Sequence, residues 1–133
     1  MISIEMNKKT ILVDAWNTFV THNGINKELL SILDSFQNQK IIVTNANDSE
    51  RIKFGIINMP YPVFSLSHNP NKTSPEYFEK LFKVYNLSAN NVVYFEHNKD
   101  AIKSALSVGI CSFWYNHEKP NIEELVTFLK SNL

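Results

Sequence analysis

Residues 11–18 read Ile-Leu-Val-Asp-Ala-Trp-Asn-Thr, and this segment is the most informative of the chain. Its apolar half, together with Thr10, predicts a buried strand over residues 10–14. Asp14 closes that strand, and a turn follows at once. Open α/β sheets place their chemistry at the carboxyl ends of parallel strands. Asp14 is therefore the first candidate functional residue of the chain.

Alternating apolar segments and amphipathic segments continue to the end of the sequence. Further buried strands are predicted over residues 41–45, 62–66, 92–96 and 110–114. Helical stripes of apolar side chains begin at Leu29, Phe78 and Ile122, and another helix should run from about residue 100 to residue 108, before Gly109. A helix is also expected after Asn47, where Gly55 should weaken it and Pro60 should stop it.

This order of elements predicts an α/β fold, a three-layer Rossmann-like, doubly wound parallel sheet of about five strands. The chain has 133 residues, which suits one domain over residues 1–133. Every predicted connection is short, so no cap domain is expected between the strands. A response-regulator receiver has the same layout, but it needs an acid at the end of its third strand. Residues 63–67, Val-Phe-Ser-Leu-Ser, supply none.

Composition limits the partners and the compartment. Thirteen basic and thirteen acidic residues give a formal net charge of zero, without a basic block, so neither nucleic acid nor a membrane surface is expected as a partner. The apolar runs are too short to span a bilayer, and residues 1–9 lack the apolar core of a signal peptide. The single cysteine, Cys111, is expected to be a buried thiol. Together these features predict a cytoplasmic protein.

Polar residues stand at several later strand ends and loops. Thr44 and Asn45 follow the second apolar strand, and Lys72 stands just before a helix opened by Ser74-Pro75. Glu96 closes the fourth strand, and Asp100 follows it after three residues. Parallel strands end at one edge of a sheet, so these side chains are expected to converge on Asp14.

These four segments, taken in order, resemble the motifs of the haloacid dehalogenase (HAD) superfamily of hydrolases, in a capless form. The matching stretches are Ile11–Thr18, Ile41–Asn45, Asn71–Pro75 and Val92–Ala101, with Gly109 downstream. The resemblance implies that Asp14 is a nucleophile that attacks phosphorus. It implies that Lys72, Thr44 and Asn45 contact the transferred group.

The resemblance also implies a metal cofactor and a class of substrate. Mg²⁺ would be held by Asp14, by the backbone carbonyl of Trp16, and by Glu96 and Asp100, because this ion prefers oxygen ligands. The substrate would be phosphorylated, either a small molecule or a macromolecule. Without a cap, the site is open, and an oligomer could cover it.

The first motif departs from the family pattern at Trp16. Phosphatases of the family carry a second Asp there, which protonates the leaving group. Trp cannot exchange a proton at neutral pH, and general acid–base help is typically worth about 10²–10⁴ in rate. The Trp16 side chain is expected either at the mouth of the site, where it could contact substrate, or in a contact with a partner. Glu96 and Phe95 also replace the usual Asp and Gly.

Three functional interpretations follow. The first is an Mg²⁺-dependent phosphohydrolase of weak or unusual activity, favoured by Asp14, Lys72, Glu96 and Asp100. The second is a catalytically impaired HAD-like protein kept for binding or assembly, favoured by Trp16. The third is a dehalogenase, since those enzymes carry an aromatic residue at this position; however, they need no metal and they carry a cap.

The histidines and an aromatic run carry weaker expectations. His97 is expected to be solvated beside the strand end, although it could be a proton donor or a ligand. His22, His68 and His117 are expected to be exposed in loops. Phe113-Trp114-Tyr115 is expected to belong to the core of the sheet.

Overall fold

A computed structural model describes residues 8–133. Most of residues 1–9, where no signal peptide was expected, therefore lies outside the described part. Its strands are β1 (Thr10–Asp14), β2 (Val20–Thr21), β3 (Gly24–Ile25), β4 (Lys40–Thr44), β5 (Val63–Ser65), β6 (Val92–Glu96) and β7 (Cys111–Trp114). Its helices are α2 (Lys27–Asp34), α3 (Asp48–Phe54), α4 (Pro75–Tyr85), the 3₁₀ turn η1 (Ala89–Asn91), α5 (Lys99–Ser107) and α6 (Ile122–Asn132). Over residues 8–133, none of the helices combines the length and the apolar character needed to cross a bilayer.

Five strands form a parallel sheet in the order β5-β4-β1-β6-β7. The first strand lies at the centre because the chain winds outward from it in both directions. In the register, Val13 of β1 lies opposite Ile42 of β4 on one side and Phe95 of β6 on the other. The predicted fold class is confirmed, and the five predicted strands agree with the observed ones to within one residue at each end.

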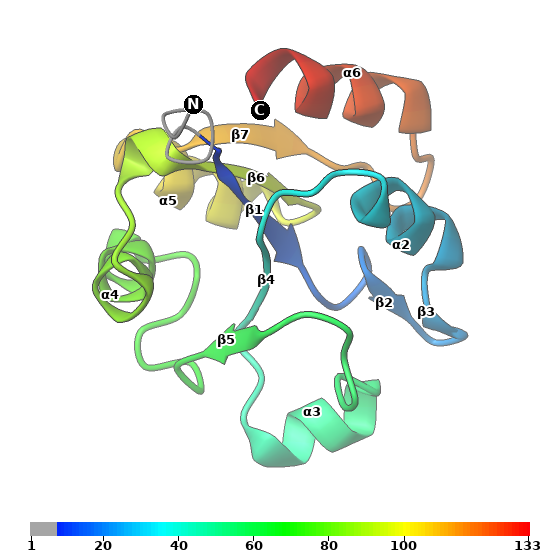
Figure 1. Ribbon diagram of the computed structural model, residues 1–133. Coiled ribbons are helices and arrows are strands. Elements are labelled where there is room, and N and C mark those ends of the chain that lie inside the picture. The colour runs from blue at the N-terminus through cyan, green and yellow to red at the C-terminus, as the bar shows by residue number, and fades with distance from the viewer. Residues whose placement is uncertain (1–7) are drawn as a thin grey trace.

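The helices cover both faces of this sheet (Figure 1). On one face, Ile11 and Val13 pack with apolar side chains of α2 and α6, among them Leu29 and Leu125. On the other face, Leu12 packs with side chains of α4 and α5. Successive residues of a strand point to opposite faces, so the continuous apolar run of β1 fills two cores at once. No cap domain is inserted between these elements over the described range 8–133.

A short hairpin after β1 was not predicted. Strands β2 and β3 pair antiparallel, with Val20 opposite Ile25, where the sequence predicted only a single helix before Lys40. Phe19 and Val20 are fully buried under this hairpin. Each of its strands has two residues, which is too short for an alternating pattern to be visible in the sequence.

Helix α3 is present, and its ends are better defined than the sequence suggested. Asn47 and Glu50 form a capping box at its start, in which each side chain accepts from the other residue's backbone N–H. Gly55 adopts a left-handed conformation, with φ of 75°, immediately after the last helical residue. The expectation that Gly55 weakens this helix is therefore wrong: Gly55 terminates it, in the conformation that glycine adopts at least cost.

The edge strand β7 corrects two expectations of burial. Within residues 8–133 it pairs only with β6, so no strand of this part of the chain covers its other side. Trp114 is 40% exposed, and its ring lies beneath the ammonium of Lys99, with Nζ 4.3 Å from the ring centroid. Cys111 is only half-buried, whereas Tyr115 is buried as expected. The aromatic run therefore belongs to the core only in part.

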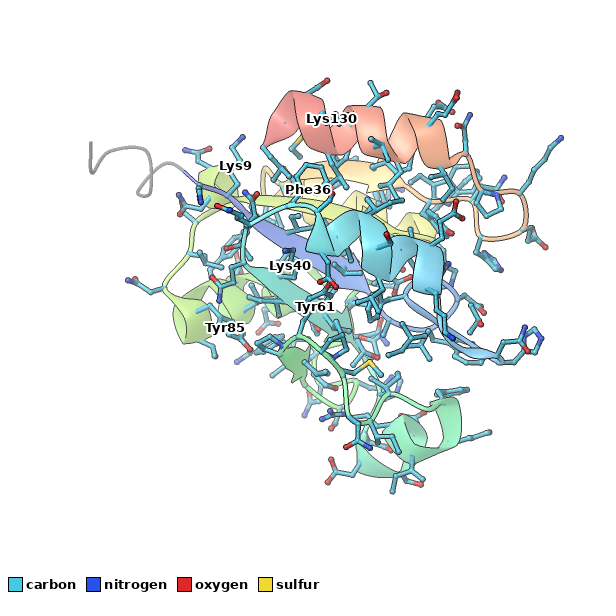
Figure 2. The ribbon with its side chains drawn as sticks, turned by 45° about the vertical axis from the view of Figure 1, so that its right-hand side comes forward. Lys9, Phe36, Lys40, Tyr61, Tyr85 and Lys130 are labelled. Atoms are coloured by element: carbon cyan, nitrogen blue, oxygen red, sulfur yellow. The ribbon has the colours of Figure 1, made fainter. Side chains whose placement is uncertain are left out.

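At the opposite edge, Tyr61 connects the segment before β5 to the neighbouring elements. Its hydroxyl donates to Asp34 Oδ1 at 2.6 Å, and Lys40 Nζ lies 5.8 Å from its ring centroid. Figure 2 shows Lys40 and Tyr61 lying close together, far from Lys130 on α6. These contacts fix the end of α2 against the edge that carries β5.

The packing of α4 can be tested with two substitutions on one helix. Leu81→Ala removes a fully buried side chain and should lower the free energy of unfolding by about 2–5 kcal/mol. Val84→Ala, at a side chain that is 64% exposed, should change it by less than about 0.5 kcal/mol. Urea denaturation followed by circular dichroism measures both. Equal effects of the two substitutions would contradict the proposed burial of this helix face.

Candidate active site

The carboxyl ends of β1, β4 and β6 meet around a cavity of about 170 Å³. Residues from four separated segments line it, and they include Asp14, Trp16, Thr44, Asn45, Lys72, Glu96 and His97. Thus all the sequence-predicted site residues except Asp100 share one cavity. Since a carboxylate, an ammonium and an imidazole meet here at low exposure, this cavity is the candidate active site.

Asp14 and Lys72 form a buried ion pair. Lys72 Nζ lies 2.7 Å from Asp14 Oδ1, and the two residues are 6% and 2% exposed. Burial alone would raise the pKa of Asp14, but the charge of Lys72 and the hydrogen bond with His97 outweigh burial and hold that pKa well below its usual range. Asp14 is therefore ionised at neutral pH and offers a carboxylate to the cavity.

Lys72 also reaches Glu96, so one ammonium holds two carboxylates. Its Nζ lies 2.8 Å from Glu96 Oε1, and the side chain of Glu96 is fully buried. Burial lowers the pKa of Lys72, but the charges of Asp14 and Glu96 raise it above its usual value. The backbone N–H of Lys72 donates to Asn45 Oδ1 at 2.6 Å, which fixes the loop that delivers this side chain. Lys72 is a charged cation at every physiological pH.

Glu96 has a hydrogen-bond partner on each of its oxygens. Tyr94 donates its hydroxyl to Oε1, and the backbone N–H of Asn98 donates to Oε2 at 3.0 Å. Burial and the nearby charge of Asp14 raise the pKa of Glu96, while Lys72 opposes that rise. Tyr94 was not among the predicted site residues. Its place two positions before Glu96 on the same strand, and hence on the same face, is a signal that the sequence did contain.

His97 is a site residue that the sequence analysis expected in solvent. Its Nδ1 contacts Asp14 Oδ2 and lies 3.3 Å from Glu96 Oε2. Its backbone N–H also donates to Asp14 Oδ2, at 3.3 Å. Burial lowers the pKa of His97, but the hydrogen bonds to Asp14 and Glu96 outweigh it and raise the pKa to about 9. At neutral pH the site therefore holds two cations, Lys72 and His97, beside the ionised Asp14.

Thr44 and Asn45 lie on the opposite side of the cavity, at the end of β4. Thr44 Oγ1 accepts from the backbone N–H of Ala46 at 3.2 Å, and the hydroxyl remains free to rotate its own proton. The hydroxyl of buried Tyr77 accepts from the Thr44 N–H at 3.1 Å and lies 2.8 Å from the carbonyl of Phe64. Tyr77 therefore joins the ends of β4 and β5 and fixes the wall from which Thr44 projects.

Thr18 holds the second oxygen of Asp14. Its hydroxyl donates to Asp14 Oδ2 at 2.7 Å, and its side chain is fully buried. The tight turn after β1 brings these residues together, with backbone N–H groups of Thr18 and Val20 both donating to the carbonyl of Ala15. Thr18 belongs to the first motif but was not among the predicted site residues. Its hydroxyl orients the carboxylate of Asp14.

Trp16 forms an apolar wall of the cavity. Its ring lies against Phe54 of α3, with centroids 4.8 Å apart. The indole is half-buried, and the neighbouring Glu50 and His68 continue the rim, joined by a contact of 2.7 Å between His68 Nε2 and Glu50 Oε1. No group of Trp16 can exchange a proton. The position where phosphatases of the resembled family carry an acid thus presents an apolar surface here.

Asp100 is the predicted site residue that the structure does not bring to the cavity. It is exposed in the first turn of α5 and lines a separate shallow hollow with Thr73 and Lys103. Its backbone N–H donates to Asn98 Oδ1 at 2.8 Å, because Asn98 caps this helix. The first turn of α5 therefore directs Asp100 away from Glu96, and its expected pairing with Glu96 is absent from the cavity.

The donor atoms around Asp14 suit a divalent cation. Asp14, Glu96 and His97 each offer one ligand atom, and these atoms lie within 4.8 Å of one another. Two buried carboxylates supply the hard oxygen ligands that Mg²⁺ prefers. The same two carboxylates are already compensated by Lys72 and His97, so a bound cation would compete with a proton at His97.

No protein-family model and no curated protein matches the chain in sequence. Solved structures do match its fold. A HAD family enzyme from Bacteroides thetaiotaomicron, solved as an Asp-to-Ala mutant with magnesium and inorganic phosphate, superposes with a TM-score of 0.69 over 89% of this chain and 98% of its own, at 11% identity.

Two further structures agree with that match. The core domain of a candidate phosphoglycolate phosphatase from Streptococcus pneumoniae gives a TM-score of 0.64 at 18% identity, over 93% of this chain and 96% of its own. A candidate β-phosphoglucomutase from Thermotoga maritima gives 0.60 at 20% identity, over 80% of this chain and 59% of its own. The chain therefore has the fold of the haloacid dehalogenase superfamily, in a form without a cap over residues 8–133.

The contacts of His97 predict a dependence of stability on pH. The pKa of His97 is about 9 in the folded protein, above the value of about 6.5 expected when unfolded. A raised pKa stabilises the folded state below the unfolded value, and the stabilisation is lost as the pH rises through the folded value. The free energy of unfolding should fall by roughly 2–3 kcal/mol between about pH 6.5 and pH 9.

Urea denaturation in the presence of a chelator measures this dependence. His97→Gln keeps a polar side chain that does not titrate, and it should flatten the profile in this range. His22→Gln, at an exposed position in the β2–β3 turn, should leave the wild-type profile unchanged. If His97→Gln and the wild type lose stability in parallel, His97 is not the group responsible.

Proposed function

We propose that this protein is a HAD-type hydrolase that cleaves phosphate esters through an aspartyl-phosphate formed on Asp14. The observation that carries the proposal is the buried contact of 2.7 Å between Lys72 and Asp14 at the carboxyl edge of the sheet. A carboxylate held against a permanent cation is ionised and oriented, as a nucleophile must be. The phosphate and magnesium bound by the Bacteroides enzyme of the same fold support this choice of chemistry.

In the proposed first step, Asp14 attacks phosphorus and the ester oxygen leaves with the electrons of the broken bond. Lys72 balances the charge of the transferred phosphoryl group, with the hydroxyl of Thr44 and the amide of Asn45 as hydrogen-bond donors. Water then hydrolyses the acyl-phosphate and regenerates the carboxylate. Thr18 and Lys72 keep the two oxygens of Asp14 in fixed positions between these steps.

We further propose that Asp14 and Glu96 hold Mg²⁺ when it is bound. The ion would neutralise charge on the phosphoryl oxygens, which is its usual contribution to phosphoryl transfer. The backbone carbonyl of Trp16 stays a candidate third ligand. Asp100 is exposed on α5 and is not assigned to this set.

The leaving group receives no proton from Trp16, which stands where phosphatases of the resembled family carry an acid. The proposed activity is therefore greatest on substrates whose leaving oxygen is weakly basic, such as aryl phosphates or acyl phosphates. A cavity of about 170 Å³ accommodates a phosphoryl group and little more, so the remainder of a small or macromolecular substrate would lie outside it. A second copy of the chain could cover this opening. The proposed compartment is the cytoplasm, where phosphate esters are available as substrates.

A binding or assembly protein is the alternative that one observation favours. Trp16 packs on Phe54 at 4.8 Å and gives the cavity an apolar wall in place of a general acid. A site of this kind could bind a phosphorylated ligand without turning it over. The two functions differ in whether Asp14 becomes phosphorylated.

A panel of phosphate esters tests the proposed nucleophile. With Mg²⁺ present, the wild type should hydrolyse p-nitrophenyl phosphate or acetyl phosphate, and Asp14→Asn should reduce kcat by at least about 10³, because the amide cannot form the acyl-phosphate. Asp34→Asn, at an exposed acid on α2, is the matched control and should keep full activity. Turnover that survives in Asp14→Asn would place the activity elsewhere, and absence of turnover on every ester would favour the binding protein.

Substitution of Trp16 tests the missing general acid. Trp16→Asp should raise kcat on alkyl phosphates, by up to about 10²–10⁴, because it supplies a proton to a basic leaving group. Trp16→Asn introduces a side chain of nearly the same size as Asp and opens the same space in the cavity. Unlike Asp, the Asn side chain cannot donate a proton as an acid. The ratio of the two rates separates proton transfer from access to the cavity. Equal rates would show that the side chain of Trp16 limits only access.

A further inference from the structure

The oxygens around Asp14 are divided between two sides. Lys72 Nζ donates hydrogen bonds to Oδ1 of Asp14 and to Oε1 of Glu96. The other oxygen of each carboxylate, Oδ2 and Oε2, faces His97 Nδ1, which contacts the first and lies 3.3 Å from the second. Two oxygens and one nitrogen therefore converge on the side of the site away from Lys72.

We propose that Asp14, Glu96 and His97 form a metal site of mixed oxygen and nitrogen ligands, which binds Mn²⁺, Co²⁺ or Zn²⁺ more tightly than Mg²⁺. His97 contributes Nδ1 as the third ligand. The proposal concerns the same cavity as the hydrolase but does not depend on hydrolysis, because metal binding is measured without substrate. Mg²⁺ would still bind, through the two carboxylates, with lower affinity.

The donor types decide the preference. Imidazole nitrogen suits zinc, iron, nickel and copper, whereas Mg²⁺ prefers an all-oxygen shell and keeps several of its waters. Neighbouring ligands of one transition-metal ion bonded at about 2.0–2.2 Å lie roughly 3 Å apart. The separation of 3.3 Å between His97 Nδ1 and Glu96 Oε2 is close to that spacing. All three ligand atoms lie within 4.8 Å of one another.

Neighbouring groups hold the three ligands in place. The indole N–H of Trp114 donates to the carbonyl of His97 at 2.8 Å, and Thr18 donates to Asp14 Oδ2 at 2.7 Å. The N–H of Asn98 donates to Glu96 Oε2 at 3.0 Å. Such supporting hydrogen bonds orient metal ligands and increase affinity for the ion. The exposed Trp114 therefore has a role in fixing the backbone of His97.

The charges in the site also suit a divalent ion. Asp14 and Glu96 contribute two negative charges, and Lys72 contributes one positive charge on their far side. A metal ion bound at Nδ1 would displace the proton of His97, so the cluster of Asp14, Glu96 and Lys72 with its divalent ion would carry one net positive charge. That positive charge would lie next to the cavity, where a phosphate or another anion would bind.

Isothermal titration calorimetry on chelator-treated protein tests the proposal. Wild type should bind Co²⁺ and Zn²⁺ at least about tenfold more tightly than Mg²⁺. Its affinity for Mn²⁺ should be higher than for Mg²⁺ and lower than for Co²⁺. His97→Asn replaces nitrogen with an amide oxygen, and it should weaken Co²⁺ and Zn²⁺ by at least about tenfold while leaving Mg²⁺ within about threefold. His68→Asn, at the exposed rim of the same cavity, is the matched control and should preserve the wild-type order.

A spectroscopic measurement on the wild type needs no variant. Electron spin echo modulation of Mn²⁺-loaded protein should show coupling to an imidazole nitrogen, and this coupling should vanish in His97→Asn. Equal affinity of wild type for Mg²⁺ and Co²⁺, or a Mn²⁺ spectrum without nitrogen coupling, would overturn the proposal. Failure of hydrolysis with tight, His97-dependent metal binding would reject the hydrolase and leave this metal site standing.

Discussion

One ammonium group, that of Lys72, lies between two buried carboxyl groups, and the arrangement of the site depends on it. Lys72 comes from the loop before α4, and it contacts Asp14 at the end of β1 and Glu96 at the end of β6. Each of these charges would be costly to bury alone, by several kcal/mol per ion. Each is tolerated because the others are present, together with Thr18, Tyr94 and the backbone N–H of Asn98. The parallel sheet supplies the condition for this arrangement, since it ends all its strands at one edge.

The fold could be read from the sequence because each element carries a strong local pattern. Buried parallel strands give continuous apolar runs, and the helices between them repeat apolar residues every three or four positions. The β2–β3 hairpin was not predicted, because strands of two residues are too short to show an alternating apolar pattern. Trp114 was assigned to the core on its apolarity, but burial in an edge strand depends on what covers the strand. That information lies in the order of the strands and is absent from local sequence.

The site residues that stand at the ends of strands could be predicted from the sequence. Asp14, Thr44 and Glu96 are fixed by the register of the sheet, and Lys72 by the loop that Asn45 holds. Asp100 was expected in the site and His97 in solvent, whereas the structure places His97 in the cavity and Asp100 outside it. The reason is geometrical. Asn98 starts α5 at a position that turns Asp100 outward, while the backbone of His97 is still at the strand end and its ring turns inward toward Asp14.

The central position of β1 has a consequence for how the chain acquires its structure. Among the five strands of the described sheet, β1 is synthesised first, yet its partners β4 and β6 follow about 30 and 80 residues later in the register. Until β6 has been synthesised, one side of Ile11–Asp14 has no strand to pair with, and long-range parallel pairing is intrinsically slow. We therefore expect the nascent chain to expose an apolar, unpaired strand edge until β6 has been made. Such an edge is the kind of surface that molecular chaperones protect from aggregation.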